Sequence, residues 1–211
     1  MVPTLGIAEA ITNLKDIREK FDLSRSNDPL FFRKWIEHLP DLTESEKEIL
    51  DRLQNRYFYY ADEGSITEGT IEIVAIAPLL EVLEFCDPPF KIRSEQAVRV
   101  EVEDRETPLQ GFIDALVVQE QLWVVVIEAK RYGFNVSFAI PQTLAYMMGN
   151  SNLEQPTFGM ATNGEDYIFI KLDRQGKQYD LSDKLTLSTR RQNELYEVVR
   201  IMKRIKEDLL G

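Results

Sequence analysis

The chain has 211 residues, 44% of them hydrophobic, which is the length and composition of one globular domain or of one domain with an appendage. Its net charge of -11 has the wrong sign for a protein that binds nucleic acid through charge alone. One cysteine, Cys86, excludes an internal disulfide, and without a cluster of Cys or His a structural zinc site is not expected. No apolar run is long enough for a membrane span and the N-terminus lacks the plan of a signal peptide, so we expect a cytoplasmic protein.

The first 65 residues have the pattern of a helical segment. Two groups of apolar residues are close to helical spacing, namely Ile7, Ala10, Ile11, Leu14 and Ile17, and then Leu30, Phe31, Trp35 and Ile36. Thr43 and Glu46 have the spacing of a capping box, which predicts a helix that begins after Thr43. His38, next to Pro40, is expected near the C-terminal end of a helix and not as a catalytic base. We predict a helical extension over 1–65 that packs on a domain formed by 66–211.

The rest of the chain alternates between helical and strand patterns. The expected elements, in chain order, are a helix over 70–85 that ends at Asp87-Pro88-Pro89, strands over 91–102, 110–118 and 122–127, a helix over 136–148, strands over 157–161 and 167–172, and a terminal helix. The strand over 122–127 has six consecutive apolar residues, which indicates burial on both faces. The terminal helix carries a stripe that docks on the core or, as the alternative, forms a dimer seam; the stripe is Leu195, Val198, Met202, Ile205 and Leu209.

Three ionisable residues are expected to meet at one end of two of these strands. Asp114 lies near the start of one strand and Glu128 near the end of the next, so an antiparallel hairpin through residues 119–121 brings the two carboxylates together. Lys130 follows Glu128 by two residues and shares its face. Two hard oxygen ligands beside an ammonium suit Mg²⁺ and a polyanionic substrate. The alternative is a surface pair between Glu128 and Lys130, with Asp114 as an ordinary edge residue.

This pattern resembles the PD-(D/E)xK nuclease superfamily, with Ile113 at the position of the family's Pro. Gln142 and Tyr146, four residues apart on one helical face, resemble the Gln-x-x-x-Tyr element of recombination-repair helicases and of the N-terminal nuclease domain of type I restriction R subunits. The alternative is a core Tyr146 beside a solvated Gln142. The resemblance covers about residues 65–175. It implies an α/β (α+β) fold of the restriction-endonuclease type, in which helices flank a central mixed sheet.

The function that the resemblance implies is Mg²⁺-dependent hydrolysis of nucleic acid, with DNA as the expected substrate and Mn²⁺ as an alternative metal. Asp114, Glu128 and the backbone carbonyl of Ala129 would hold the metal, Lys130 would orient the attacking water, and Gln142 and Tyr146 would position the nucleic-acid backbone. Glu72, six residues before Pro78, looks like the further acid in the Glu-to-Pro-Leu-Leu helix of the R subunits. Glu81 and Glu84 are alternatives to Glu72, and all three could be solvated.

Several features limit or compete with this interpretation. The chain has no phosphate-binding Gly-x-x-x-x-Gly-Lys-Ser/Thr loop, since Gly176-Lys177 lacks both the upstream Gly and the following hydroxyl. The partner alternatives are a separate motor or specificity subunit and a second copy of this chain. Residues 1–90 hold 18 acids and 9 bases, whereas 171–211 hold 7 acids and 10 bases, so we expect weak binding to nucleic acid or help from a partner. The competing classes are an inactive scaffold with this fold and a metal-dependent hydrolase of a smaller phosphorylated substrate.

Overall fold

The structure is a computed structural model that describes residues 5–33, 36–64, 66–102, 107–120, 122–189 and 192–210. Its strands are β1 (Leu5–Gly6), β2 (Ser24–Arg25), β3 (Phe90–Val100), β4 (Leu109–Gln119), β5 (Leu122–Ala129), β6 (Thr157–Thr162), β7 (Asp166–Asp173), β8 (Gln178–Leu181) and β9 (Leu185–Thr186). Its helices are α1 (Ile7–Ala10), α2 (Leu14–Phe21), α3 (Glu44–Asp62), α4 (Glu68–Ile71), the π-helix η2 (Glu72–Ile76), α5 (Ala77–Val82), the 3-10 helix η3 (Val136–Phe138), α6 (Ala139–Met147) and α7 (Leu195–Leu210).

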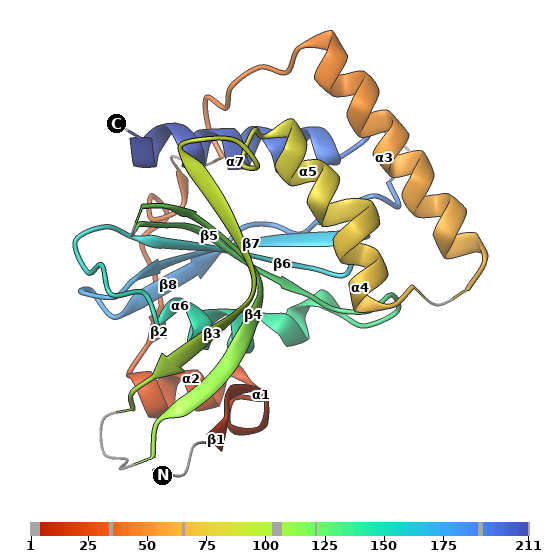
Figure 1. Cartoon of the computed structure of the whole chain (residues 1–211). Helices are drawn as coiled ribbons and strands as arrows, with labels where there is room; N and C mark the ends of the chain where they lie inside the picture. Colours follow the sequence, from red (N-terminus) through yellow and green to blue (C-terminus); the bar gives the residue numbers. More distant parts are fainter. Residues whose placement is uncertain are drawn as a thin grey trace.

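One mixed sheet runs through the described residues. Its order is β1-β4-β5-β6-β7-β8-β2, with β3 paired to β4 and β9 paired to β7. The pairs β3–β4, β4–β5, β6–β7 and β7–β8 are antiparallel, whereas β5–β6 is parallel. In Figure 1, β3 and β4 form a long ribbon that crosses in front of the other strands, between α5 at one end and α1 at the other.

Helices cover both faces of the sheet. Helices α3, α5 and α7 lie over one face, whereas α1, α2 and α6 lie over the other (Figure 1). Along β5, Val125 and Ile127 pack in the core under α3, α5 and α7, whereas Val126 packs in the core under α1, α2 and α6. The strand is therefore buried on both sides, as its unbroken apolar run predicted. The predicted fold class, a central mixed sheet flanked by helices, is confirmed.

The terminal helix docks on the core. Its stripe residues Leu195, Val198, Met202 and Ile205 are 2% exposed or less and belong to the core that α7 shares with α3 and α5. Residue Leu209 packs against the same core. The docking interpretation of the stripe is therefore confirmed. In the part of the chain that the structure describes, no helix is long and apolar enough to cross a membrane.

The N-terminal region is only partly helical. Besides α1, α2 and α3, it contributes β1, which pairs with β4, and β2, which pairs with β8. The predicted capping box at Thr43 is confirmed, because its side chain accepts from the backbone of Glu46 while the Glu46 carboxylate accepts from the backbone of Thr43.

The helix predicted around residues 30–36 is wrong. Its described residues form turns, Trp35 lies outside the described residues, and His38 has a left-handed backbone (φ 55°) instead of ending a helix. Asp28 accepts a hydrogen bond from the backbone of Leu30, and Lys171 of β7 donates to the carbonyl of Phe31. These polar contacts override the local apolar spacing.

The helix predicted over 70–85 is present but irregular. Helix α4 passes into the π-helix η2 at Glu72, and α5 then runs from Ala77 to Val82 and ends before Asp87, as expected. Pro78 lacks the N–H that a regular helix would use to bond the carbonyl of Val74. The wider π-turn lies directly before this proline, which accounts for the change of helical pitch.

Candidate functional site

The predicted hairpin is formed, and it places Asp114 opposite the end of β5. Ala115 pairs with Ile127, which puts Asp114 and Glu128 at the next position of the ladder. Asp114 lies in the middle of β4 and not near its start, because β4 continues towards Leu109 in pairing with β3 and β1. The carboxylate of Asp114 extends the ladder, since its Oδ2 accepts a hydrogen bond of 2.6 Å from the backbone N–H of Ala129.

Glu128 and Lys130 form a buried ion pair. The distance between Lys130 Nζ and Glu128 Oε1 is 2.6 Å, and Glu128 is only 1% exposed. The backbone N–H of Lys130 donates to the carbonyl of Thr162, which ties the end of β5 to β6. The alternative of a surface pair is therefore wrong. Glu128 Oε2 is also buried and has no hydrogen-bond donor, an arrangement that costs free energy unless a proton or a cation occupies that oxygen.

Burial and mutual repulsion control the charges of the site. Burial, and then the negative charge of Asp114, raise the pKa of Glu128 to about 8, against the opposing effect of Lys130. Burial also raises the pKa of Asp114, although the hydrogen bond from Ala129 opposes the rise. For Lys130, burial disfavours the ammonium, but the Glu128 carboxylate outweighs this effect and the pKa is raised. The site therefore holds a protonated Lys130 and disfavours the simultaneous ionisation of Asp114 and Glu128.

Glu72 lies near the carboxylates, as the resemblance implied. It is half-buried on the π-turn η2, and its pKa is raised by burial and then by the charges of Asp114, Glu68 and Glu95. The structure does not bring Glu81 and Glu84 to this place. The carboxylate of Glu81 accepts a hydrogen bond from the thiol of Cys86, and the carboxylate of Glu84 pairs with Lys206 of α7 at 3.1 Å.

Two further acids were missed in the sequence. Glu68 and Glu95 are exposed, and both raise the pKa of Asp114. Glu95 lies opposite Asp114, because Ser94 pairs with Ala115 and Gln96 with Ile113 in an unshifted register, and its backbone is left-handed (φ 47°). The regular antiparallel register of β3 and β4 therefore brings Glu95 to Asp114, and the sequence alone did not fix that register.

Gln142 and Tyr146 interact directly beside these charges. Gln142 Nε2 donates to the phenol oxygen of Tyr146 at 2.7 Å, and the backbone N–H of Phe112 donates to the same oxygen. Tyr146 is 3% exposed, and burial, followed by the charge of Glu128, raises its pKa to about 12. A Cβ at Gly111 would lie 2.7 Å from Tyr146 Cε1, so the ring requires glycine there. Tyr146 thus belongs to the core while its hydroxyl faces the site, and Gln142 is half-buried rather than freely solvated.

Comparison with known proteins places this chain in a family. The family of the type I restriction enzyme R protein N terminus matches residues 7–178. The chain belongs to this family. A search of curated proteins found no match. A structure described as a fragment of an HsdR subunit of a type I restriction enzyme from Vibrio vulnificus YJ016 is 18% identical, with a TM-score of 0.44. That match covers 69% of this chain and 26% of the other, so this chain spans about a quarter of the length of its structural relative.

The donor atoms of this family member fit a hydrated, hard cation. Among the residues that the structure describes, no three Asp, Glu, His or Cys side chains gather closely enough to hold a metal ion. Asp114 and Glu128 would therefore act with the carbonyl of Ala129 and with water. Mg²⁺ accepts such a set, because it retains several waters and takes one or two carboxylates from the protein. The buried and unpaired Oε2 of Glu128 is the observation that supports the fit.

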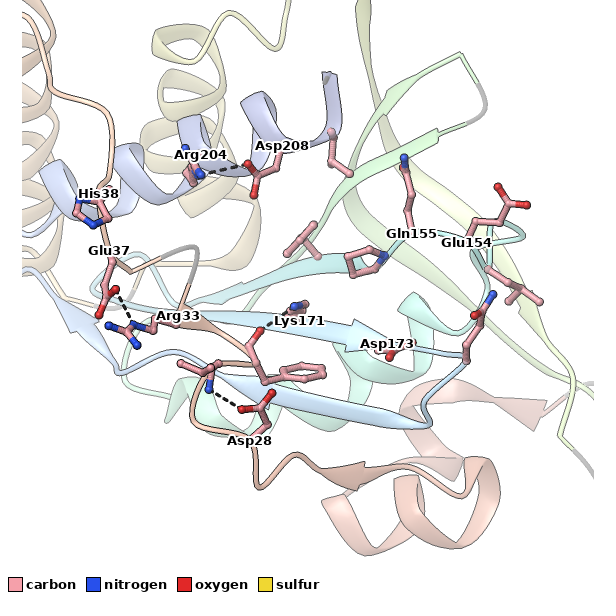
Figure 2. A pocket seen from close by; sticks show the side chains of 17 residues that line it. Asp28, Arg33, Glu37, His38, Glu154, Gln155, Lys171, Asp173, Arg204 and Asp208 are labelled. Carbon is pink, nitrogen blue, oxygen red and sulfur yellow. Dashed lines mark hydrogen bonds and ion pairs between the residues drawn. The ribbon is translucent and has the colours of Figure 1, made fainter.

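A groove of about 950 Å³ lies away from this site, between the turns around residue 31, the loop before β6 and the end of α7 (Figure 2). Its charged side chains largely neutralise one another, since Arg33 pairs with Glu37 at 2.6 Å and Arg204 with Asp208 at 3.3 Å. Neither Asp114 nor any other predicted site residue lines this groove. The candidate site therefore stays at the β4–β5 hairpin.

Proposed function

We propose that this chain is a metal-dependent nuclease domain that hydrolyses phosphodiester bonds of nucleic acid, with DNA as the substrate. The observation that carries the proposal is the buried carboxylate of Glu128, which has one oxygen on the Lys130 ammonium and the other without a partner, next to Asp114. A proton or a cation at the free oxygen relieves a carboxylate in this state, and a cation held by two carboxylates beside an ammonium is suited to a phosphate group. Membership in a family of type I restriction enzyme R proteins supports DNA as the substrate.

Each residue has a role that follows from its position. Asp114, Glu128 and the carbonyl of Ala129 would hold Mg²⁺, or Mn²⁺ in its place. The cation supplies Lewis-acid polarisation of a phosphoryl oxygen and neutralises charge. The ammonium of Lys130 lies 2.6 Å from Glu128 Oε1, which holds it in place. Lys130 orients the attacking water and stabilises negative charge that develops on the phosphoryl oxygens. Because an ammonium held by a buried carboxylate has little freedom to move, it is already oriented before the substrate arrives.

The residues around this centre position the substrate and modulate its charge. Gln142 and Tyr146 would contact the nucleic-acid backbone with an amide and a phenol. The hydrogen bond between these two groups holds both side chains in place. Glu72 adds a third carboxylate that influences the metal through its charge on Asp114. The surplus of acids repels phosphates while no cation is bound, so binding depends on the metal and on any partner, such as the other subunits of a type I restriction system.

Substitution of Lys130 tests the catalytic part of this proposal. Lys130→Ala should lower Mg²⁺-dependent cleavage of plasmid and single-stranded DNA by about 10²- to 10³-fold, the usual effect of losing one group that stabilises transition-state charge. Lys15→Ala is the matched control, because Lys15 is an exposed lysine on α2 whose ammonium pairs with its helical neighbour Glu19 at 3.5 Å. Equal activity in Lys130→Ala and wild type, with both folded by circular dichroism, would remove Lys130 from the mechanism.

Calorimetry separates the enzyme from a scaffold that merely retains the fold. Titration of wild type with Mg²⁺ or Mn²⁺ should show binding that Glu128→Gln abolishes, since an amide is a poorer ligand for a hard cation. A scaffold has no need to bind metal at Asp114 and Glu128. If neither metal binds to wild type, the enzymatic proposal fails and the scaffold becomes the better explanation of the acidic net charge.

A further inference from the structure

Three phenylalanine side chains near the candidate site face solvent. Phe112, Phe134 and Phe138 are 58%, 42% and 68% exposed, although the chain has a large apolar core in which aromatic rings could be buried. Phe112 lies two residues before Asp114, and the other two lie in the segment that joins Lys130 to α6. Exposed apolar side chains are common when scattered over a surface, but three rings close to one site require an explanation.

One ring lies on the helical face of the Gln142–Tyr146 pair, and another lies on the neighbouring strand β4. Phe138 is the N-cap of α6 and has a helical backbone, so it shares one helical face with Gln142, four residues on, and Tyr146, eight residues on. The backbone N–H of Phe112 donates to the phenol oxygen of Tyr146. Gly111 and Ile113 face Tyr146 and α6, so the ring of Phe112 lies on the other face of β4, whereas Phe138 lies on the helical face of the hydrogen-bonded pair.

The third ring is combined with a cation. The guanidinium of Arg131 lies 4.3 Å from the centroid of the Phe134 ring. Arg131 is exposed, directly follows Lys130, and has no carboxylate within 4 Å among the described residues. Hydrogen bonds hold the loop in place, since Asn163 Nδ2 donates to the carbonyl of Phe134 at 2.8 Å and the backbone N–H of Tyr132 donates to Ile66. A fixed cation and a fixed ring therefore lie side by side next to Lys130.

We propose that Phe112, Phe134 and Phe138 stack on unpaired bases, so that the site acts on single-stranded nucleic acid or on unpaired ends. This inference rests on the proposed nuclease function and adds the class of its substrate. Bases in a duplex stack on one another, whereas unpaired bases expose flat faces to aromatic side chains. Arg131 and Lys130 complement the phosphates of such a strand. A protein partner is the competing occupant, and the exposed guanidinium of Arg131 over the Phe134 ring favours a strand that carries both bases and phosphates over an apolar contact.

Binding measurements with matched substitutions test this inference. The probe is a fluorescein-labelled oligonucleotide of about 12 nucleotides, measured by anisotropy as a single strand and as a duplex, with Ca²⁺ in place of Mg²⁺. Wild type should bind the single strand more tightly. Phe138→Leu, which keeps the apolar character but removes the aromatic face, should weaken that binding about 5- to 150-fold, and Phe138→Trp should restore it. Phe112→Leu should behave like Phe138→Leu.

Controls distinguish stacking from other causes. Leu153→Ala removes another exposed apolar side chain, 48% exposed and beyond the opposite end of α6, and should leave binding unchanged. Equal or tighter binding of the duplex, or equal binding by Phe138→Leu and wild type, would overturn the inference. A Leu variant that binds the strand as well as the Trp variant does would point to a protein-docking surface instead.

Failure of this inference can be told apart from failure of the proposed function. Metal-dependent cleavage of duplex DNA that is insensitive to the Phe substitutions would refute base stacking and leave the nuclease proposal intact. Single-strand binding that depends on the rings, without cleavage of any substrate, would uphold the surface and refute hydrolysis. Absence of any binding would refute the inference, while the cleavage and calorimetric assays would decide the function separately.

Discussion

Replacement of Glu128 by Gln should flatten the pH dependence of stability in the metal-free protein. Burial raises the pKa of Glu128 from 4.5 to about 8, so the folded protein binds this proton more tightly than the unfolded chain does. The resulting contribution to stability is complete below about pH 4.5 and is lost as the pH rises through about 8. At about 1.4 kcal/mol for each pKa unit, the wild type should lose on the order of 5 kcal/mol across this window.

The variant lacks this proton equilibrium because an amide does not ionise. Other groups titrate in both proteins, so the decisive quantity is the difference between the two pH profiles. The assay is urea denaturation in EDTA at about pH 5 and about pH 8.5, where the free energy of unfolding of wild type should fall more than that of Glu128→Gln. Mg²⁺ should then restore stability to wild type at the higher pH and have little effect on the variant. Parallel profiles for the two proteins would refute a strongly raised pKa of Glu128 and remove the basis for a buried carboxylate that requires a cation.

Two further substitutions test the packing around the site and the start of α3. Gly111→Ala should destabilise the fold by about 1–3 kcal/mol, because its Cβ would overlap the ring of Tyr146. Gly69→Ala is the matched control: it lies in α4 with nothing within 4 Å, and it should be neutral or stabilising by up to about 1 kcal/mol in the same urea titration. Thr43→Ala should cost about 1 kcal/mol through loss of the helix cap, and an unchanged urea midpoint would show that the cap contributes nothing to stability.

The sequence predicted those elements whose conformation depends on nearby residues. The apolar run over 122–127 specifies a doubly buried strand, and the hairpin it forms with β4 follows from short-range pairing. The turns around Phe31 could not be predicted in this way, because the Lys171 ammonium that bonds the Phe31 carbonyl comes from β7, 140 residues later. The π-turn before Pro78 was equally hidden, since the proline indicates that the helix must adjust but not where the extra residue is accommodated.

The positions of Asp114, Glu128 and Lys130 were accessible from the sequence for the same reason, whereas the surrounding acids were not. Whether these residues act in catalysis stays a prediction, but their proximity follows from a hairpin of adjacent strands. Glu68 and Glu95 come from a separate helix and from a strand with an irregular residue, so only the assembled fold reveals their effect on Asp114. The aromatic rings were missed because an exposed Phe and a buried Phe look alike in a sequence.

The left-handed backbone of Glu95 coincides with a change in the faces of β4 at Asp114. Ile113 belongs to the core under α6 and Ala115 to the core under α7, although residues two apart on a regular strand share one face. The β3–β4 ribbon therefore twists at Asp114, opposite the left-handed Glu95, while the register of the two strands is the same on both sides of this point. Beyond this twist β4 no longer pairs with β5, and the backbone N–H of Ala129 is left to bond the Asp114 carboxylate instead of a backbone carbonyl. The distortion, the end of the β4–β5 pairing and the bonded carboxylate of Asp114 thus lie at one position, so a substitution that regularised the ribbon should disturb the site before it disturbed the fold.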